Sequence, residues 1–205
     1  EQLGVHNPPF DDLLIYSNTA PRTDEATPEG SALGGELCYL ELDTGVPVVA
    51  VNAGTNLSFV KPYITEFRAI DTPAEGSQFR SRDFFPKRVA ELATGDHRSL
   101  GEALPVESVP DPPAQTVCHV DGYGNVKTSI RASSFDLDRR ELSVTINGVD
   151  RPVVVNQEAF ADDETIMLVP GSAGGEDPYL ELIQRGDSAA AAFDEPTPGD
   201  RLRLG

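Results

Sequence analysis

The strongest constraint on the fold of this chain is a proline- and acid-rich stretch near its middle. Residues 101–113 contain four prolines in the steps Leu104-Pro105, Val109-Pro110 and Pro112-Pro113. Proline fixes its own φ and has no N–H to donate, so such a stretch is stiff and poorly suited to a helix or a central strand. We predict a connector at residues 104–113, between a domain of residues 1–103 and a domain of residues 114–205.

The segments before this stretch predict a mixed α/β domain. Residues 37–42, 46–51 and 64–70 are rich in the apolar and β-branched side chains typical of strands. Residues 83–94 place apolar side chains at helical spacing, and Gly95 follows where a C-terminal capping glycine belongs. The first domain should therefore combine a sheet with a helix.

The segments after the stretch predict an almost wholly β domain. Asn147-Gly148 separates residues 141–146 from residues 149–155, and this dipeptide is a strong signal for a tight hairpin. We expect further short strands at residues 165–169, 179–184 and 201–204, and one or two helical turns at residues 187–193 capped by Asp187. This pattern predicts a β-barrel or β-sandwich.

One hairpin of this second domain carries a concentration of polar groups. In Val120–Ile130, Asp121, Tyr123 and Asn125 alternate with two glycines between two β-like runs. Glycine lets the backbone approach a ligand closely, so the turn could present these side chains to a bound molecule. The same residues are also the usual formers of an ordinary Asx-type turn, and the spacing alone leaves both interpretations open.

Composition excludes several classes of function. The net charge is −18, so the chain lacks the basic face that a nucleic acid would need. No run of about 18 apolar residues and no secretory signal is present, which indicates a cytoplasmic protein without a membrane partner. The acid excess resembles the solvated surface of halophilic proteins. Cys38 and Cys118 are expected to be free thiols, and the scattered cysteines and histidines predict no metal site.

Segments along nearly the whole chain resemble one enzyme family. The segments are Tyr16-Ser17-Asn18-Thr19, Val48–Leu57, Phe79–Asp83, Val120–Ile130, and Tyr179–Leu182 with Gly186–Ala190. In this order they are similar to the S-adenosylmethionine (SAM)-dependent nucleophilic adenosyltransferases, which include the SAM hydroxide adenosyltransferases (SAM hydrolases), the fluorinases and the chlorinases. The resemblance implies attack of hydroxide or a halide on C5′ of SAM, with methionine as the leaving group. SAM is the substrate, and no cofactor is implied.

The resemblance also implies roles for residues in both halves. Phe79 matches an aromatic wall beside the nucleophile, and three hydroxyl groups match those that surround it: Tyr16, Thr19 and Ser81. The residues that match the binding groups for SAM are Asp121 for the methionine ammonium, Ser172 for its carboxylate, Tyr123 for the nucleoside and Asn125 for the adenine. The family further implies a homotrimer with sites between subunits.

Each N-terminal candidate has a simpler interpretation. Tyr16 and Phe79 could be core aromatics, and Ser81 could be the N-cap of the helix that follows. Arg80 and Arg82 could be surface charges or could form an ion pair with Asp83. These alternatives stay open at the level of the sequence.

The chain departs from the water-using branch of the family. That branch activates water with an Asp-Arg-His set, but Tyr16 stands at the Asp position and Arg80 at the His position, with Arg22 near the Arg position. Arginine stays protonated and cannot act as a base, so the pocket is more similar to the halogenase version. The family's first strand, which binds the ribose, would precede Glu1, so the N-terminal domain is expected to be incomplete relative to the family. The alternative function is a SAM- or adenosine-binding homologue without turnover.

Overall fold

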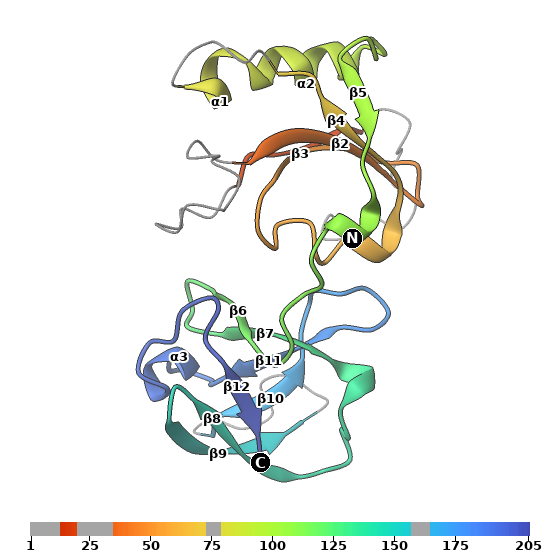
Figure 1. Ribbon diagram of the computed structural model, residues 1–205. Coiled ribbons are helices and arrows are strands. Elements are labelled where there is room, and N and C mark those ends of the chain that lie inside the picture. Colours follow the sequence, from red (N-terminus) through yellow and green to blue (C-terminus); the bar gives the residue numbers. More distant parts are fainter. Residues whose placement is uncertain (1–12, 20–34, 73–78, 157–164) are drawn as a thin grey trace. The chain divides into compact units, whose positions relative to one another are not determined.

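The computed structural model describes residues 13–19, 35–72, 79–156 and 165–205. These residues form two compact units, and the boundary between the units falls between Pro112 and Pro113. Figure 1 shows the elements of both units. No helix in the described ranges is long and apolar enough to cross a membrane.

The N-terminal unit is a five-stranded mixed sheet with a helical layer on one face (Figure 1). Its strands, in the order β1-β3-β2-β4-β5, are β1 (Ile15–Ser17), β3 (Pro47–Asn52), β2 (Glu36–Leu42), β4 (Ile64–Ile70) and β5 (Leu100–Ala103). Its helices are α1 (Arg80–Asp83) and α2 (Phe85–Ala93), with a 3-10 turn at Lys61–Tyr63 and another at Val106–Ser108. The β1–β3 pair is parallel, and the other pairs are antiparallel.

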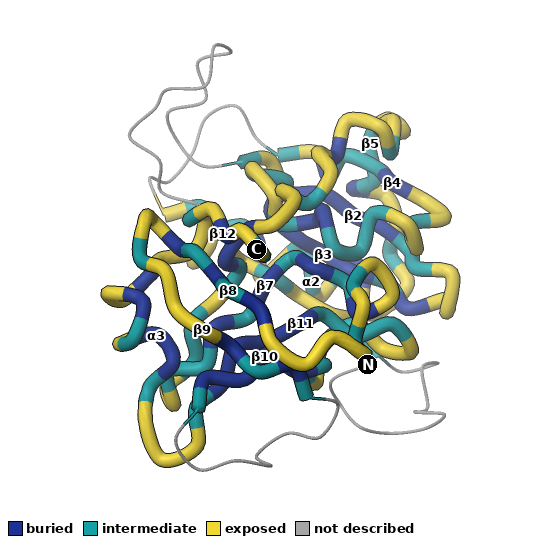
Figure 2. The backbone as a smooth tube through the Cα atoms, turned by 90° about the horizontal axis from the view of Figure 1, so that it is seen from below, coloured by how far each residue is buried: buried dark blue, intermediate teal, exposed yellow. Residues whose placement is uncertain are grey.

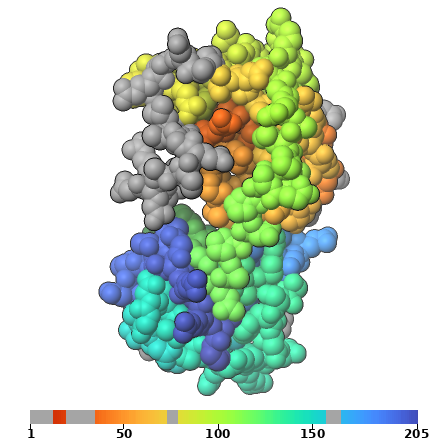
Figure 3. Space-filling view, viewed as in Figure 1, coloured from red at the N-terminus to blue at the C-terminus, as the bar shows by residue number. Residues whose placement is uncertain are grey.

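Both faces of this sheet are buried, because alternate residues of β2 are apolar on both sides. The face beneath α2 has a core of Leu37, Tyr39, Val49, Val51, Ile70, Phe85 and Leu92. The opposite face has a core of Cys38, Leu40, Val48, Ala50, Leu57, Phe67 and Val109. Val109 is fully buried, so residues 104–109 pack onto this second face. Figure 3 shows the yellow-green segment around residues 100–110 on the surface of the unit.

The helix predicted over residues 83–94 is confirmed as α2, and a separate helical turn, α1, precedes it with a break at Phe84. Phe84 has a ψ of −52° at a φ of −123°, outside the usual helical range. Pro86 has no N–H to donate to the Arg82 carbonyl, and its ring would clash there, so a continuous helix cannot run through this point. At the other end Gly95, with a φ of +80°, donates its N–H to the Leu92 carbonyl, which confirms the predicted capping glycine.

The C-terminal unit is a nearly closed barrel of seven strands with the order β12-β8-β9-β10-β11-β7-β6. The strands are β6 (Val117–Val120), β7 (Val126–Arg131), β8 (Glu141–Ile146), β9 (Val149–Val155), β10 (Met167–Pro170), β11 (Tyr179–Ile183) and β12 (Leu202–Leu204). A bridge between Thr116 and Arg201 joins the two edges of the sheet. The predicted fold class, an α/β domain followed by an all-β barrel or sandwich, is confirmed.

Alternate residues of β7 and β8 are buried in the barrel core, and a continuous run in β11 is buried as well; Figure 2 colours buried residues dark blue. Asn147 and Gly148 both have positive φ, 51° and 84°, as a two-residue hairpin of this kind requires. The predicted helical turns are α3 (Ala189–Ala192), but the capping residue is Ser188 and not Asp187. The Ser188 hydroxyl accepts the N–H of Ala191, while the Asp187 carboxylate bonds only the adjacent backbone N–H of Ser188.

Candidate functional site

The hairpin between β6 and β7 holds the Asp121 carboxylate in a network of short hydrogen bonds. Its Oδ1 accepts the backbone N–H groups of Tyr123 and Asn125 at 2.9 and 3.0 Å. Its Oδ2 accepts the Asn125 side-chain amide at 3.0 Å. The turn therefore has Asx geometry, which fixes the carboxylate in one position. Tyr123, at the tip, is 85% exposed.

The surroundings of Asp121 keep it ionised. Partial burial works to raise its pKa, but hydrogen bonds from the side chain and N–H of Asn125, the N–H of Tyr123 and the charge of Lys127 outweigh that effect. The net result is a pKa below the usual value. At neutral pH the turn presents a fixed negative charge beside an exposed aromatic ring.

Helix α3 is docked directly against this turn. The N–H of Ala190 donates to the Gly124 carbonyl at 2.9 Å. Gly124 has a φ of +82°, and a Cβ built on it would lie 2.1 Å from the Ser188 hydroxyl oxygen. Glycine is therefore required by both conformation and space. The structure thus brings residues 120–130 into contact with residues 188–190, a contact that the sequence did not predict.

The loop that carries Ser172 is held by two strands of the same barrel. The Ser172 N–H donates to Glu181 Oε1 at 3.3 Å, and Lys127 Nζ donates to the same oxygen at 2.7 Å. At the other end of the loop, the Arg131 guanidinium donates to the Asp177 carbonyl at 2.6 Å. The Ser172 side chain itself is exposed.

Sequence reasoning missed Lys127, Glu181 and Arg131 as supporting residues. Two signals could have found them. Glu181 is the one acidic residue in the otherwise apolar strand β11, and it is 7% exposed. Lys127 and Arg131 lie on the same face of β7, because side chains alternate along a strand.

Two of the N-terminal candidates, Tyr16 and Thr19, lie at or just after the end of a strand that has the same direction as two others in the sheet. β1 is parallel to β3, and β4 has the same direction because both β3 and β4 pair antiparallel with β2. Tyr16 lies in β1 and Thr19 follows it. The Asn56 amide, in the loop after β3, donates to the Thr19 carbonyl, which joins these two strand ends. Phe79 and Ser81 follow β4 in the chain. The carboxyl edge of a sheet is the usual place for a ligand site in α/β folds.

The simpler interpretations of Tyr16, Phe79 and Ser81 are not supported, whereas that of Arg82, a surface ion pair with Asp83, is confirmed. Tyr16 is 36% exposed and Phe79 is 54% exposed, so neither is a core aromatic. Ser81 lies inside α1, whose N-cap is Phe79, so Ser81 is not a cap. Arg82 forms a two-point pair with Asp83, with one contact at 2.8 Å, on the surface. Partial burial raises the pKa of the Tyr16 hydroxyl, which keeps it neutral.

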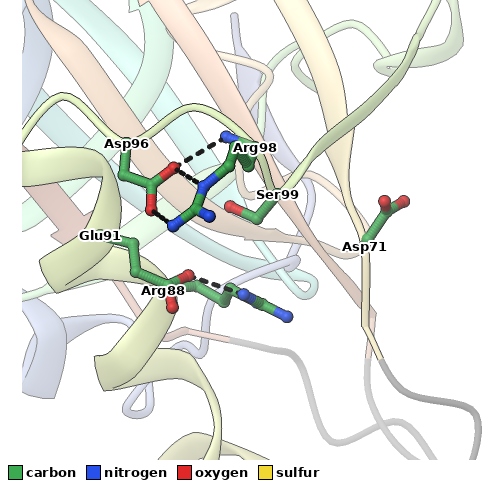
Figure 4. Close-up of a pocket in the computed structure, with 6 residues that line it drawn as sticks. All are labelled: Asp71, Arg88, Glu91, Asp96, Arg98 and Ser99. Carbon is green, nitrogen blue, oxygen red and sulfur yellow. Dashed lines mark hydrogen bonds and ion pairs between the residues drawn. The ribbon is translucent and has the colours of Figure 1, made fainter.

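The N-terminal unit also has a polar cavity of about 180 Å³ that the sequence analysis did not indicate. Figure 4 shows its lining, which consists of Asp71, Arg88, Glu91, Asp96, Arg98 and Ser99. Arg88 pairs with Glu91, and Arg98 pairs with Asp96, each at 2.6 Å. The side-chain hydrogen bond from Arg98 is the main cause of the lowered Asp96 pKa. None of the candidate site residues lines this cavity.

The cysteines do not form a reactive centre in the described part of the chain. Burial raises the pKa of the Cys38 thiol to about 12 and that of the Cys118 thiol to about 11. Both cysteines are free thiols, as predicted. Among the described residues, no cluster of three or more His, Cys, Asp or Glu side chains could hold a metal ion.

The fold defines a class of proteins in which a mixed sheet precedes a small barrel, and solved structures of this class exist. An uncharacterized conserved protein from Thermotoga maritima superposes with a TM-score of 0.65 at 21% identity, over 83% of this chain and 72% of that chain. A conserved hypothetical protein from Thermus thermophilus gives a TM-score of 0.60 at 20% identity, over 94% of this chain and 74% of that chain. No family model and no curated protein matches the sequence. At this identity the similarity establishes the fold alone.

Proposed function

We propose that this chain is a SAM-dependent adenosyltransferase, in which hydroxide or a halide attacks C5′ of SAM and methionine leaves. The observation that carries the proposal is the β6–β7 turn, where a fixed, ionised Asp121 stands beside the exposed ring of Tyr123. SAM has an ammonium group on its amino-acid tail and a flat nucleoside, which match a carboxylate and an aromatic ring. The proposal also uses the motif order described above and the two-unit fold.

Each group of the turn has a part in binding. Asp121 receives the ammonium group of the methionine portion, and Ser172 binds its carboxylate. The ring of Tyr123 packs on the nucleoside. The Asn125 amide nitrogen is engaged by Asp121, so its oxygen is the acceptor for the adenine amino group.

The reaction itself requires little proton transfer. The sulfonium of SAM leaves as neutral methionine, and the electron pair of the breaking C5′–S bond stays on sulfur. The nucleophile needs alignment and release from water. The hydroxyl groups of Tyr16, Thr19 and Ser81 are the donors that replace its hydration, and the raised pKa of Tyr16 keeps that group a donor. In the proposed homotrimer these donors meet the Asp121 turn of a neighbouring subunit.

Product analysis tests the proposal. The chain is incubated with SAM, with and without chloride, and the nucleosides are separated by chromatography. We expect methionine together with adenosine, or with 5′-chloro-5′-deoxyadenosine when chloride is high. Only intact SAM, from a preparation of established trimeric state, would overturn the enzymatic proposal.

A matched pair of variants assigns the tail-binding role. Asp121→Asn removes the charge but keeps an oxygen for the turn N–H groups. Asp150→Asn is the control, because Asp150 also accepts hydrogen bonds on the surface of the barrel, from Ser143 and Thr145. We expect Asp121→Asn to lower the affinity for SAM by about tenfold to hundredfold and the affinity for adenosine by less than about twofold. The reason is that a charge-assisted hydrogen bond is lost only with SAM. Equal losses for both ligands would contradict the assignment.

One observation favours a second candidate, a binding protein without turnover. Tyr16 and Arg80 occupy the positions where the water-using branch has its Asp and His, and Arg80 cannot accept a proton. Calorimetric binding of SAM or adenosine without any product, at low and high chloride, would favour this candidate. Product formation under either condition would exclude it.

A further inference from the structure

The ion pair between Lys127 and Glu181 joins the two segments that the proposed function assigns to the methionine tail. Lys127 is the second residue of β7, six residues after Asp121. Glu181 lies on β11, where it is the register partner of Lys127. Their charged atoms are 2.7 Å apart, and their side chains are 26% and 9% exposed. A pair this buried is costly to desolvate, so it needs a closely fitted environment.

Glu181 is fitted closely to the Ser172 loop. The Oε1 atom that binds Lys127 also accepts the Ser172 N–H. A Cβ built on Gly171 would lie 2.1 Å from the same oxygen, so only glycine allows this approach. The Glu181 carboxylate is therefore in direct contact with the backbone at Gly171 and Ser172.

Lys127 acts on the other segment as well. Its charge contributes to the field that stabilises the ionised Asp121 carboxylate. One ammonium group thus lies within the electrostatic reach of the Asp121 turn and in direct contact with the carboxylate that holds the Ser172 loop. A rigid strand, β7, carries both Lys127 and the end of the turn.

We infer that Lys127 and Glu181 are positioning residues that hold the Ser172 backbone at a fixed spacing from the Asp121 carboxylate. With the roles proposed above, Asp121 and Ser172 are the two contacts to the methionine tail of SAM. The inference rests on the proposed function for the identity of the ligand. The positioning itself is a property of the barrel alone.

Four variants of the whole chain test the inference. Lys127→Met leaves the Glu181 charge unpaired, and the double variant Lys127→Met/Glu181→Leu removes both charges. Lys127→Arg is the conservative variant that keeps the pair. Lys61→Met is the matched control, because it breaks an equally short ion pair, to Asp111, in the other unit.

Three measurements are made on each variant. The first is the affinity for SAM and for adenosine by calorimetry. The second is hydrogen exchange at the Ser172 amide, and the third is the free energy of unfolding in urea. We expect Lys127→Met to lower the affinity for SAM by about tenfold to hundredfold, since loss of alignment between the contacts from Asp121 and Ser172 has effects of that size. Adenosine affinity should change by less than about twofold, and Ser172 should exchange at least about tenfold faster.

The double variant separates positioning from stability. Because no unpaired charge remains, its stability should recover relative to Lys127→Met. Its SAM affinity should stay low, whereas Lys127→Arg should restore it and Lys61→Met should not change it. If the double variant recovers SAM affinity together with stability, the pair is only structural and the inference is overturned.

The same experiment distinguishes failure of the inference from failure of the proposed function. If the unchanged chain binds neither SAM nor adenosine, the proposed function fails, and with it the ligand selectivity. The positioning role is then decided by the Ser172 amide. Faster exchange in Lys127→Met but not in Lys61→Met supports it, and equal exchange in both overturns it.

Discussion

Replacing Gly124 by alanine tests whether the β6–β7 turn is locked to α3 as the structure indicates. The φ of Gly124 is +82°, where a residue with a Cβ costs about 1 to 2 kcal/mol. The new Cβ would lie 2.1 Å from the Ser188 hydroxyl oxygen and 3.0 Å from the Ser188 Cα. The hydroxyl cannot rotate away without losing its cap to the Ala191 N–H, which is worth about 1 kcal/mol.

Overlap with the Ser188 backbone adds a further cost, because that part of the neighbour cannot move independently. Overpacking of this kind costs about 1 to 3 kcal/mol. Together these effects predict that Gly124→Ala lowers the free energy of unfolding by about 3 to 6 kcal/mol. The matched control is Gly122→Ala in the same turn, where no atom lies within 4 Å of the added Cβ and φ is not positive. That change should stay within about 0.5 kcal/mol.

The assay is urea unfolding followed by circular dichroism, because the chain has no tryptophan for fluorescence. SAM binding is measured on the same samples. Gly124→Ala should lose stability and SAM affinity together, and Gly122→Ala should retain both. If the two variants were equally stable, the contact between the turn and α3 would be wrong, and the reasoning about the turn with it.

Three further predictions concern charge, thiols and loop support. The pKa of Asp121 in the folded chain is lowered from the ordinary value of 3.8. The stability that the ionised carboxylate contributes should therefore be fully present above pH 3.8 and be lost as the pH falls through the lowered pKa. A stability difference between the unchanged chain and Asp121→Asn that already disappears near neutral pH would contradict this. Cys38 and Cys118, with pKa values raised to about 12 and 11, should react with maleimide far more slowly in the folded chain than in urea, and equal rates would show that the thiols are accessible. Arg131→Met should lower the free energy of unfolding in urea by about 1 to 3 kcal/mol, because the guanidinium stacks 3.8 Å from the centre of the Tyr179 ring and donates to two carbonyls of the Ser172 loop. The control is Arg151→Met, on the exposed part of β9, and an equal loss there would argue against a specific role for Arg131.

Much of the fold could be predicted from local pattern. The strands β2 and β8, the Asn147-Gly148 turn and the Gly95 cap each depend on a few neighbouring residues, and each was confirmed. The helix over residues 83–94 was predicted from its apolar spacing, and it is present as α2 with Pro86 in its first turn, where proline is tolerated; the separate turn α1 before it was not predicted. The α3 cap was assigned one residue too early, since Asp187 and Ser188 are both good capping residues and only packing on Gly124 selects Ser188.

The candidate site was less accessible to sequence reasoning, because its supports are distant in the chain. Lys127 and Glu181 are 54 residues apart, and their contact depends on the register of β7 with β11. The hydrogen bonds within the Asp121 turn are local, and the Asx interpretation anticipated them. The two interpretations of that turn, an ordinary Asx turn and a turn that presents side chains to a ligand, are compatible. A carboxylate that is fixed by its own turn is also held in place for a ligand.

The most direct test of the account is isotope tracing of the products from SAM. The chain is incubated with SAM in water enriched in the heavy oxygen isotope, with and without chloride, and methionine and nucleosides are analysed by mass spectrometry. The account predicts heavy oxygen at the 5′ position of adenosine, or chlorine there when chloride is the nucleophile, and unlabelled methionine in equal amount. Heavy oxygen in the amino-acid product, or no product beyond that formed in buffer alone, would contradict attack at C5′.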